Sequence, residues 1–402
     1  MVANPLEQPT LDRLRARTSL KWRQYDPDVL PLWVAEMDVD LADPVADAII
    51  GAARAGDTGY PSGTAYAEAF AGFAERRWSW PSFPVGRSAL VPDVMTGIVE
   101  VLKLVTGPGD AVVITPPVYP PFYAFTEHAD RRVVEAPLGA GGRLEPASLD
   151  DAFGRARADG RSAVFLLCNP HNPTGIVPTA AELETVAALA ERHGVVVVAD
   201  EIHAPLVLPG AAFTPWLSVT GGSRTFALTS ASKGWNLAGL KAALLTAGAG
   251  AADDMARLPE EVGHGPSHLG VLAHTAAVAD GGPWLDALLA GLDANRTLLG
   301  ELLAAQLPSV GWVPPESTFL AWLDCRRTGL ADEAAERAAG RGDVTLSVGA
   351  AAAFLERSRV ALNAGSAFGD GGAGHVRLNF GTSSSILREA VARMATALAP
   401  PS

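Results

Sequence analysis

Cysteine is scarce in this sequence, because the 402-residue chain holds only Cys168 and Cys325. Two thiols cannot form a disulfide framework in a chain of this length, so we expect a reducing, cytoplasmic setting. Long apolar runs are missing too: none reaches the ~18–20 residues that a membrane-spanning helix needs, and the first residues lack the apolar core of a signal peptide. No membrane partner is therefore expected.

Positive charge is in deficit, with 31 Lys and Arg against 44 Asp and Glu and a formal net charge of −13. Such a chain is a poor partner for nucleic acid, so a small anionic ligand would have to be held by local cations. The eight histidines are scattered, and neither H-E-x-x-H nor C-x-x-C occurs, so we expect no metal site. The sequence has no G-x-G-x-x-G between a strand and a helix, which argues against a nicotinamide-linked enzyme.

Hydrophobic residues make up 48% of the chain, which is ample for a buried core and for two domains. Short apolar runs at 110–117, 161–170, 194–201 and 223–232 read as strands, and apolar spacing of three and four over 179–194 predicts a helix. The run GVVVVADE is apolar at nearly every position, as in a strand that is covered on both faces. This order of strand, helix and strand predicts βαβ units and a parallel sheet.

The C-terminal third has a different pattern. It holds a long amphipathic helix over 283–307, strand-like segments at 317–325 and 375–380, and a final helix from Ser384 onward. We therefore predict a large α/β domain over 46–282 and a small α+β domain over 283–402. The N-terminal segment 1–45 is expected to pack with the small domain.

Four clusters of polar residues stand where apolar runs end: CNPHNPTG (168–175), ADEIH (199–203), SASKGWNLAGLK (230–241) and VRLNFG (376–381). In open α/β sheets, ligands bind outside the carboxyl ends of the strands. Three of the clusters follow strands of the predicted parallel sheet. We therefore expect these clusters to converge on one site although they are far apart in the sequence.

The residue types in these clusters suit one kind of chemistry. Lys233 has a second cation, Lys241, eight positions later, and a nearby cation or desolvation makes a lysine nucleophilic near pH 7. Asp200 follows a buried strand and needs a cationic partner, such as a protonated pyridine nitrogen. Ser230 and Lys241 could take a phosphate, and the fork of Arg377 matches a carboxylate. Together they describe pyridoxal phosphate holding an amino acid.

The order NPTG, D-x-x-H and S-x-S-K, with a cation eight residues after the lysine, resembles the fold-type I pyridoxal-phosphate enzymes of the class I/II aminotransferase superfamily. The segment SLKWRQYDPDVLPLWVAEMDV is similar to the MalY/PatB-type cystathionine β-lyase branch, whose members are C–S lyases. The resemblance covers nearly the whole chain. It implies a large domain with a mostly parallel sheet flanked by helices, a smaller α+β domain, and a cytoplasmic homodimer with shared active sites.

The resemblance also implies a role for each matching residue. Lys233 would form the Schiff base with the cofactor and move the α-proton, and Asp200 would pair with the ring nitrogen. Asn172 and His203 would hydrogen-bond the phenolic oxygen of the cofactor. The further cofactor contacts would be Thr96, Gly97, Tyr119, Ser230, Lys241 and, from a second subunit, Tyr60, and the substrate contacts would be Arg377, Val34 and Ala35.

The implied reaction is elimination of a thiol from a β-thio-substituted L-amino acid, which yields pyruvate and ammonia. Transamination with a 2-keto acid is the alternative, because it uses the same residues. His203 favours the lyase, since many aminotransferases have a tyrosine at that position. Glu36 stands where the branch usually has Asp, Val39 where it has an aromatic residue, and Gly234 follows the lysine. These departures concern the substrate side rather than the cofactor.

Two further readings use the same residues. The string from Ser230 to Lys233 is also S-x-x-K, the nucleophile signature of penicillin-recognising serine hydrolases, but that class also needs S-D-N and K-T-G, and neither occurs here. A non-catalytic scaffold with the same fold would not need Lys233, Asp200 and Arg377 together. Both readings therefore explain fewer of the residues than the pyridoxal-phosphate enzyme does.

Overall fold

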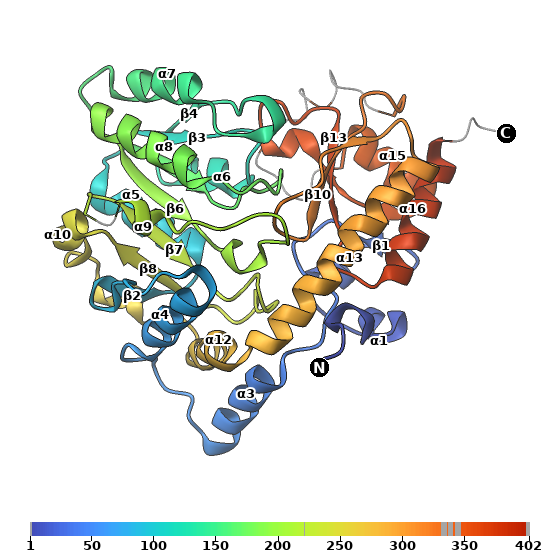
Figure 1. Ribbon diagram of the computed structural model, residues 1–402, viewed down its shortest axis with the longest axis horizontal. Coiled ribbons are helices and arrows are strands. Elements are labelled where there is room, and N and C mark those ends of the chain that lie inside the picture. Colours follow the sequence, from blue (N-terminus) through green and yellow to red (C-terminus); the bar gives the residue numbers. More distant parts are fainter. Residues whose placement is uncertain (1, 221, 331–335, 337–340, 342–346, 399–402) are drawn as a thin grey trace.

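The computed structural model describes residues 2–220, 222–330, 336, 341 and 347–398. Within these residues a seven-stranded sheet and a four-stranded sheet lie side by side, on the left and on the right of Figure 1. The two-stranded pairing of β1 (Leu30–Pro31) with β11 (Val360–Ala361) ties the N-terminal segment to the C-terminal part of the chain. The N-terminal segment and the C-terminal part of the chain therefore lie next to each other.

The large sheet is mostly parallel, as the sequence predicts. Its strand order is β2 (Ser88–Val91), β8 (Ala243–Ala247), β7 (Phe226–Thr229), β6 (Val196–Asp200), β5 (Ala163–Cys168), β3 (Ala111–Ile114) and β4 (Arg132–Glu135). Neighbouring strands from β7 to β4 pair in parallel, and only β8 runs against the others. The carboxyl ends of the parallel strands thus share one edge.

Helices cover both faces of this sheet, and the alternation of side chains along each strand explains why the strands are apolar throughout. Val112 and Ile114 of β3 belong to the core cluster that contains α5 (Val94–Val105). Ala111 and Val113 belong to the cluster that contains α7 (Pro146–Arg157) and α8 (Ala180–His193). A strand with helices on both sides has no solvent face, so it needs apolar residues at successive positions.

The other α-helices of the described residues are α1 (Leu11–Arg15), α2 (Leu20–Arg23), α3 (Asp43–Ala55), α4 (Ala65–Trp78), α6 (Pro121–His128), α9 (Trp216–Thr220), α10 (Ala252–Met255), α11 (Glu260–Gly263), α12 (His268–Asp280), α13 (Gly282–Gln306), α15 (Gly349–Ser358) and α16 (Ser384–Leu398). Helix boundaries follow local signals. A capping box between Thr179 and Glu182 begins α8, and Gly194 ends it with a left-handed φ of 64°.

The small sheet is antiparallel, with the order β12 (Asn363–Ala364), β13 (His375–Asn379), β10 (Leu320–Asp324) and β9 (Gly311–Trp312). The long helix α13 runs from α12, beside the large sheet, to α16, beside the small one (Figure 1). The strand and helix patterns of the C-terminal third are confirmed by β10, β13, α13 and α16. The arrangement places β13 against the N-terminal segment that follows β1.

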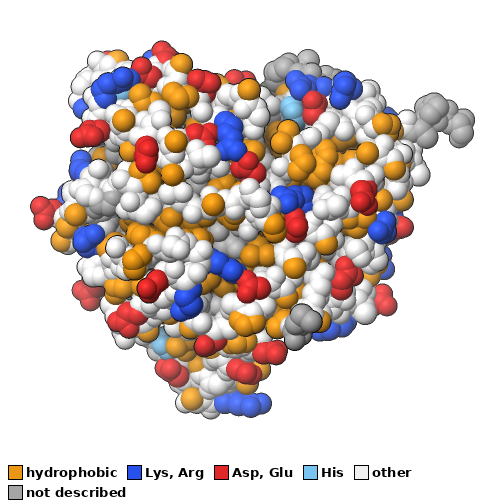
Figure 2. Space-filling model, in the orientation of Figure 1, with side chains coloured by type: hydrophobic (Ala, Val, Ile, Leu, Met, Phe, Trp, Pro, Cys, Tyr) orange, Lys and Arg blue, Asp and Glu red, His pale blue; other side chains and the backbone are white. Residues whose placement is uncertain are grey.

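Charges of both signs are interspersed over the face shown in Figure 2, where Lys and Arg lie among Asp and Glu. The net excess of acid is thus not gathered in a single patch on this face. Among the described residues, none of the helices combines the length and the apolar character that crossing a bilayer would require.

Candidate active site

A pocket of about 270 Å³ opens at the carboxyl edge of the large sheet. Its lining includes Ala35, Asp93, Tyr119, Asn172, Asp200, His203, Lys233 and Lys241. Asp200 ends β6, Asn172 follows β5, and Lys233 lies in the loop after β7. The predicted convergence of the three clusters that follow parallel strands is therefore what the fold produces.

The amine of Lys233 faces this pocket and donates a hydrogen bond to the carbonyl oxygen of Ala35 at 2.9 Å. Burial and, to a smaller extent, the positive charge of Arg377 together lower the pKa of Lys233 to about 8, against the opposing effect of Glu36 and Asp200. The amine is therefore partly neutral near pH 7, as a nucleophile or a general base must be.

Asp200 is a buried carboxylate, 4% exposed. Its Oδ1 accepts a hydrogen bond from the backbone N–H of Ile202 at 3.1 Å. Burial raises the pKa of Asp200 to about 6, and no ion pair joins it to a cation within the described part of the chain. A buried carboxylate of this kind would be stabilised by a ligand that places a positive charge next to it in the pocket.

His203 and Asn172 lie beside it. His203 is buried, its Nδ1 has no hydrogen-bond partner among the described residues, and burial holds its pKa well below its usual value. The ring is therefore neutral at pH 7. Asn172 is buried as well, and its Oδ1 accepts a hydrogen bond from Nη1 of Arg377 at 3.1 Å.

Arg377 comes from β13 of the small sheet and reaches the pocket through Asn172. Its Nη2 donates to the carbonyl oxygen of Trp33 at 2.9 Å and to Oδ1 of Asn363 at 2.5 Å. The guanidinium also lies over the ring of Phe368, 5.0 Å from its centroid. Burial lowers the pKa of Arg377 to about 10, so the group stays charged at neutral pH and can bind an anion.

The start of α5 supplies backbone donors, but at different residues from those predicted. The N–H of Thr96 donates to Oδ1 of Asp93 at 2.7 Å, and the N–H of Gly97 donates to the Asp93 carbonyl oxygen at 2.9 Å. The pocket is lined instead by Val94 and Met95, whose N–H groups have no hydrogen-bond partner among the described residues. The structure therefore does not bring the Thr96 and Gly97 donors to the pocket.

The reason is that Asp93 is the N-cap of α5, so the helix begins two residues before Thr96. An aspartate before an amphipathic run was the sequence signal for this boundary. Gly97 has a packing role: a Cβ there would lie 2.4 Å from Cδ2 of Leu228. Lys241 lies at the same end of the helix, with its Nζ 2.8 Å from Oδ2 of Asp93. Val94, Met95 and Lys241 together form what we call the anion cup.

Three further predicted residues are placed as follows. Ser230 is buried, and its hydroxyl donates to the carbonyl oxygen of Ala242 at 2.7 Å and lies 2.8 Å from Oγ of Ser232, which lines the pocket. Tyr119 lines the pocket, and burial raises its pKa to about 12, so it stays protonated. Tyr60 is 80% exposed and lies outside the pocket lining of its own chain.

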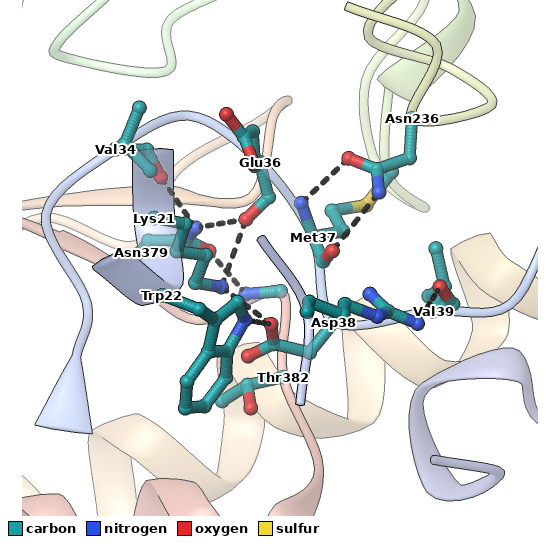
Figure 3. A network of polar contacts seen from close by, with 12 residues as sticks. Lys21, Trp22, Val34, Glu36, Met37, Asp38, Val39, Asn236, Asn379 and Thr382 are labelled. Atoms are coloured by element: carbon teal, nitrogen blue, oxygen red, sulfur yellow. Dashed lines mark hydrogen bonds and ion pairs between the residues drawn. The ribbon is translucent and has the colours of Figure 1, made fainter. Parts of the chain in front are cut away.

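An irregular segment, Trp33–Asp38, reaches the pocket at Ala35, and we call this segment the strap. Ala35 lines the pocket, and the Val34 carbonyl oxygen accepts from Nδ2 of Asn379 at 2.7 Å. Figure 3 shows the strap with side chains from three other segments around it: Lys21, Asn236 and Asn379. Sequence reasoning missed Asn236 and Asn379 because their partners are backbone atoms of a distant segment, and it missed Lys21 because no local pattern shows that this lysine is buried.

Comparison with known proteins agrees with this geometry. The family model described as aminotransferase class I and II matches residues 29–394. A Mycobacterium leprae (strain TN) protein named "Putative cystathionine beta-lyase" is 58% identical over 402 residues, which are 99% of both chains. Cystathionine beta-lyase PatB of Bacillus subtilis (strain 168) is 32% identical over 94% of this chain and 96% of its own.

A solved structure is also similar, that of a "putative plp-dependent beta-cystathionase" from Corynebacterium diphtheriae. It has a TM-score of 0.86 and 33% sequence identity, and the match covers 97% of this chain and 98% of the other.

Proposed function

The chain belongs to the class I and II aminotransferase family, and from this premise we propose that it is a pyridoxal-phosphate-dependent C–S β-lyase. It removes a thiol from a β-thio-substituted L-amino acid of the cystathionine type and yields pyruvate and ammonia. One observation carries the proposal: a single pocket holds the amine of Lys233 and the buried carboxylate of Asp200, with the guanidinium of Arg377 one hydrogen bond away. The similar proteins named as cystathionine β-lyases support the choice of reaction.

The residues of the pocket fit pyridoxal phosphate. Asp200, a buried carboxylate without an ion-pair partner among the described residues, would hold the protonated ring nitrogen. His203, whose Nδ1 has no partner there, would hold the phenolic oxygen together with Asn172. Tyr119 would lie against the ring, and the anion cup with Ser232 would hold the phosphate. Lys233 would be joined to the aldehyde carbon.

When it is bound, the cofactor supplies a conjugated cationic ring that accepts electron density from the substrate Cα. Arg377 binds the substrate carboxylate with its planar fork, which orients the Cα–H bond. Lys233 takes the proton from Cα as general base, and a pKa of about 8 leaves about a tenth of the amine neutral at pH 7. Asp200 stays ionised against the ring nitrogen and keeps it protonated.

Elimination then breaks the Cβ–S bond, and the electron pair of that bond leaves with the sulfur as a thiolate. The proton taken by Lys233 balances the charge on the leaving group. Water converts the remaining three-carbon product to pyruvate and ammonia. Apolar groups of Pro121, Phe125 and Ala238 line the same pocket, and such a wall suits the thioether part of the substrate side chain.

Product analysis tests the proposal. With L-cystathionine or S-methyl-L-cysteine and no keto acid, the loaded enzyme should release pyruvate and ammonia in equal amounts, while Lys233→Ala should release neither. Turnover that needs an added 2-keto acid, and that yields the corresponding new amino acid, would identify an aminotransferase and refute the lyase.

We also propose that the enzyme is a cytoplasmic homodimer in which Tyr60 of one subunit contacts the cofactor phosphate of the other. Tyr60 supports this, because it is a large aromatic side chain that is 80% exposed, on the segment between α3 and α4. Tyrosine is among the residue types that are enriched at interfaces. The two free thiols, Cys168 and Cys325, support the reducing compartment.

A further inference from the structure

From Trp33 to Met37, the strap is held by hydrogen bonds to its backbone, whereas Asp38 is held through its side chain. Four consecutive carbonyl oxygens, from Trp33 to Glu36, accept hydrogen bonds from side chains of other segments. Two of the donors are the reacting groups of the site: Arg377 donates to the Trp33 carbonyl and Lys233 to the Ala35 carbonyl, each at 2.9 Å. The strap therefore touches both the carboxylate-binding group and the amine.

Two asparagines hold the backbone of the strap next to these contacts. Asn379 donates from Nδ2 to the carbonyl oxygens of Val34 at 2.7 Å and Glu36 at 2.6 Å. Asn236 forms two hydrogen bonds with the backbone of Met37. Its Oδ1 accepts from the Met37 N–H at 2.8 Å, and its Nδ2 donates to the Met37 carbonyl oxygen at 3.0 Å. Figure 3 shows Asn379 at the Val34–Glu36 side and Asn236 at Met37, on opposite sides of Glu36.

Each asparagine is also close in the sequence to one reacting group. Asn379 is two residues after Arg377 on β13, so both side chains leave the same face of the strand. Asn236 is three residues after Lys233, and it holds a left-handed φ of 57° that asparagine tolerates better than other non-glycine residues. The two clamps thus place the strap relative to the amine and the guanidinium at once.

We propose that Asn236 and Asn379 are positioning residues, which hold the strap so that the Ala35 carbonyl stays on the Lys233 amine and the Trp33 carbonyl stays on Arg377. This inference rests on the proposed function, since it explains how the base and the carboxylate site keep a fixed separation. A small displacement of a catalytic group has a large effect on rate. A purely structural role would change stability without changing the chemistry of Lys233.

The amine of Lys233 reports on this arrangement in the protein without cofactor. A carbonyl that accepts from an ammonium favours the charged form, so loss of the Ala35 contact lowers the pKa of Lys233. The charged groups that act on this amine are Arg377, Glu36, Asp200 and Lys241. None of these four is altered by a change at Asn236, so a shift would come from the strap.

The experiment measures the pH dependence of Lys233 acetylation by acetic anhydride in the apoprotein, with peptide mass spectrometry. Asn236→Gly removes the amide and still accepts the left-handed backbone. In Asn236→Gly we expect the pKa of Lys233 to fall by about one unit below its wild-type value, because a hydrogen bond to a charged group is worth about tenfold or more.

Thr225→Val is the matched control for lost stability. Thr225 is buried just before β7, and its hydroxyl donates to the Val197 carbonyl at 2.7 Å and accepts from Nε1 of Trp216 at 2.6 Å. The lysine loop lies at the opposite end of that strand. Thr225→Val should leave the pKa of Lys233 unchanged while it lowers the stability of the protein.

The inference is overturned if Lys233 in Asn236→Gly titrates as it does in Thr225→Val. On the carboxylate side, Asn379→Ala in the loaded enzyme should raise KM more than it lowers kcat, and an equal KM to wild type would contradict the role of Asn379. The apoprotein labelling does not depend on the reaction catalysed. A shift in the pKa of Lys233 would support the positioning role even if product analysis showed transamination.

Discussion

Replacing Lys21 by methionine should cost the protein about 3–5 kcal/mol of unfolding free energy. The side chains of Lys21 and Asp38 are each 1% exposed and form an ion pair, with Nζ 2.9 Å from Oδ1. Methionine keeps the apolar stem and removes the charge. The Asp38 carboxylate would then stay buried with only the indole N–H of Trp22, at 3.1 Å, on Oδ1, and its Oδ2 already has no partner in the described part of the chain.

The uncompensated charge, rather than the lost bonds, dominates this estimate. Lys21 also donates to the Glu36 carbonyl at 2.9 Å, but that oxygen keeps a second donor, Nδ2 of Asn379 at 2.6 Å. The double variant Lys21→Met/Asp38→Asn leaves no buried charge behind. It should therefore be more stable than Lys21→Met alone, as a double-mutant cycle would measure.

Lys103→Met is the matched control, because it makes the same substitution at an ion-paired lysine that is exposed to solvent. Lys103 is 56% exposed and lies 2.7 Å from Glu100, three residues before it on α5. Water screens such a pair, so the substitution should change stability by about 1 kcal/mol or less.

Urea unfolding followed by tryptophan fluorescence and by far-ultraviolet circular dichroism measures these differences. Coincidence of the two curves establishes a single transition, which is needed before free energies are compared. The reasoning is refuted if Lys21→Met is no less stable than Lys103→Met. It is refuted as well if the double variant gains nothing over Lys21→Met.

Two more predictions concern activity. Arg377→Lys should raise KM for the amino acid on the order of 10- to 100-fold, because an ammonium cannot present the planar fork; titration of the cofactor by absorbance should show unchanged binding, and loss of cofactor affinity would contradict the assignment. Tyr60→Ala and Lys233→Ala should each be inactive alone and regain part of the activity when mixed and allowed to exchange subunits; a mixture that stays inactive would contradict a shared site.

Local sequence patterns were enough to predict many of the strands and helices of the fold. Strand β6 is a run of valines and α8 carries its own start and stop signals, so neither depends on distant residues for its recognition. The lysine and the aspartate of the site stand in short motifs at the ends of such strands. Because parallel strands share a carboxyl edge, their convergence followed from the order of the motifs.

The positions of the backbone N–H donors at the start of α5 were harder to predict from the sequence. The cofactor contacts at the start of α5 were predicted at Thr96 and Gly97, whereas the pocket is lined by Val94 and Met95. A shift of two residues at a helix start moves each N–H by more than half a turn. The side chain of Asp93 decides the register, because it caps the helix and takes the Thr96 donor.

The sequence by itself determined which elements form and which reactive side chains end them, because periodicity and capping act between near neighbours. Only the tertiary structure decided how the strap is held. Asn236 and Met37 are 199 residues apart in the chain, and Asn379 and Val34 are 345 apart. Lys21, which looks like an ordinary surface lysine, is 1% exposed. Such contacts exist only once both sheets and the N-terminal segment have packed together, so no local pattern encodes them.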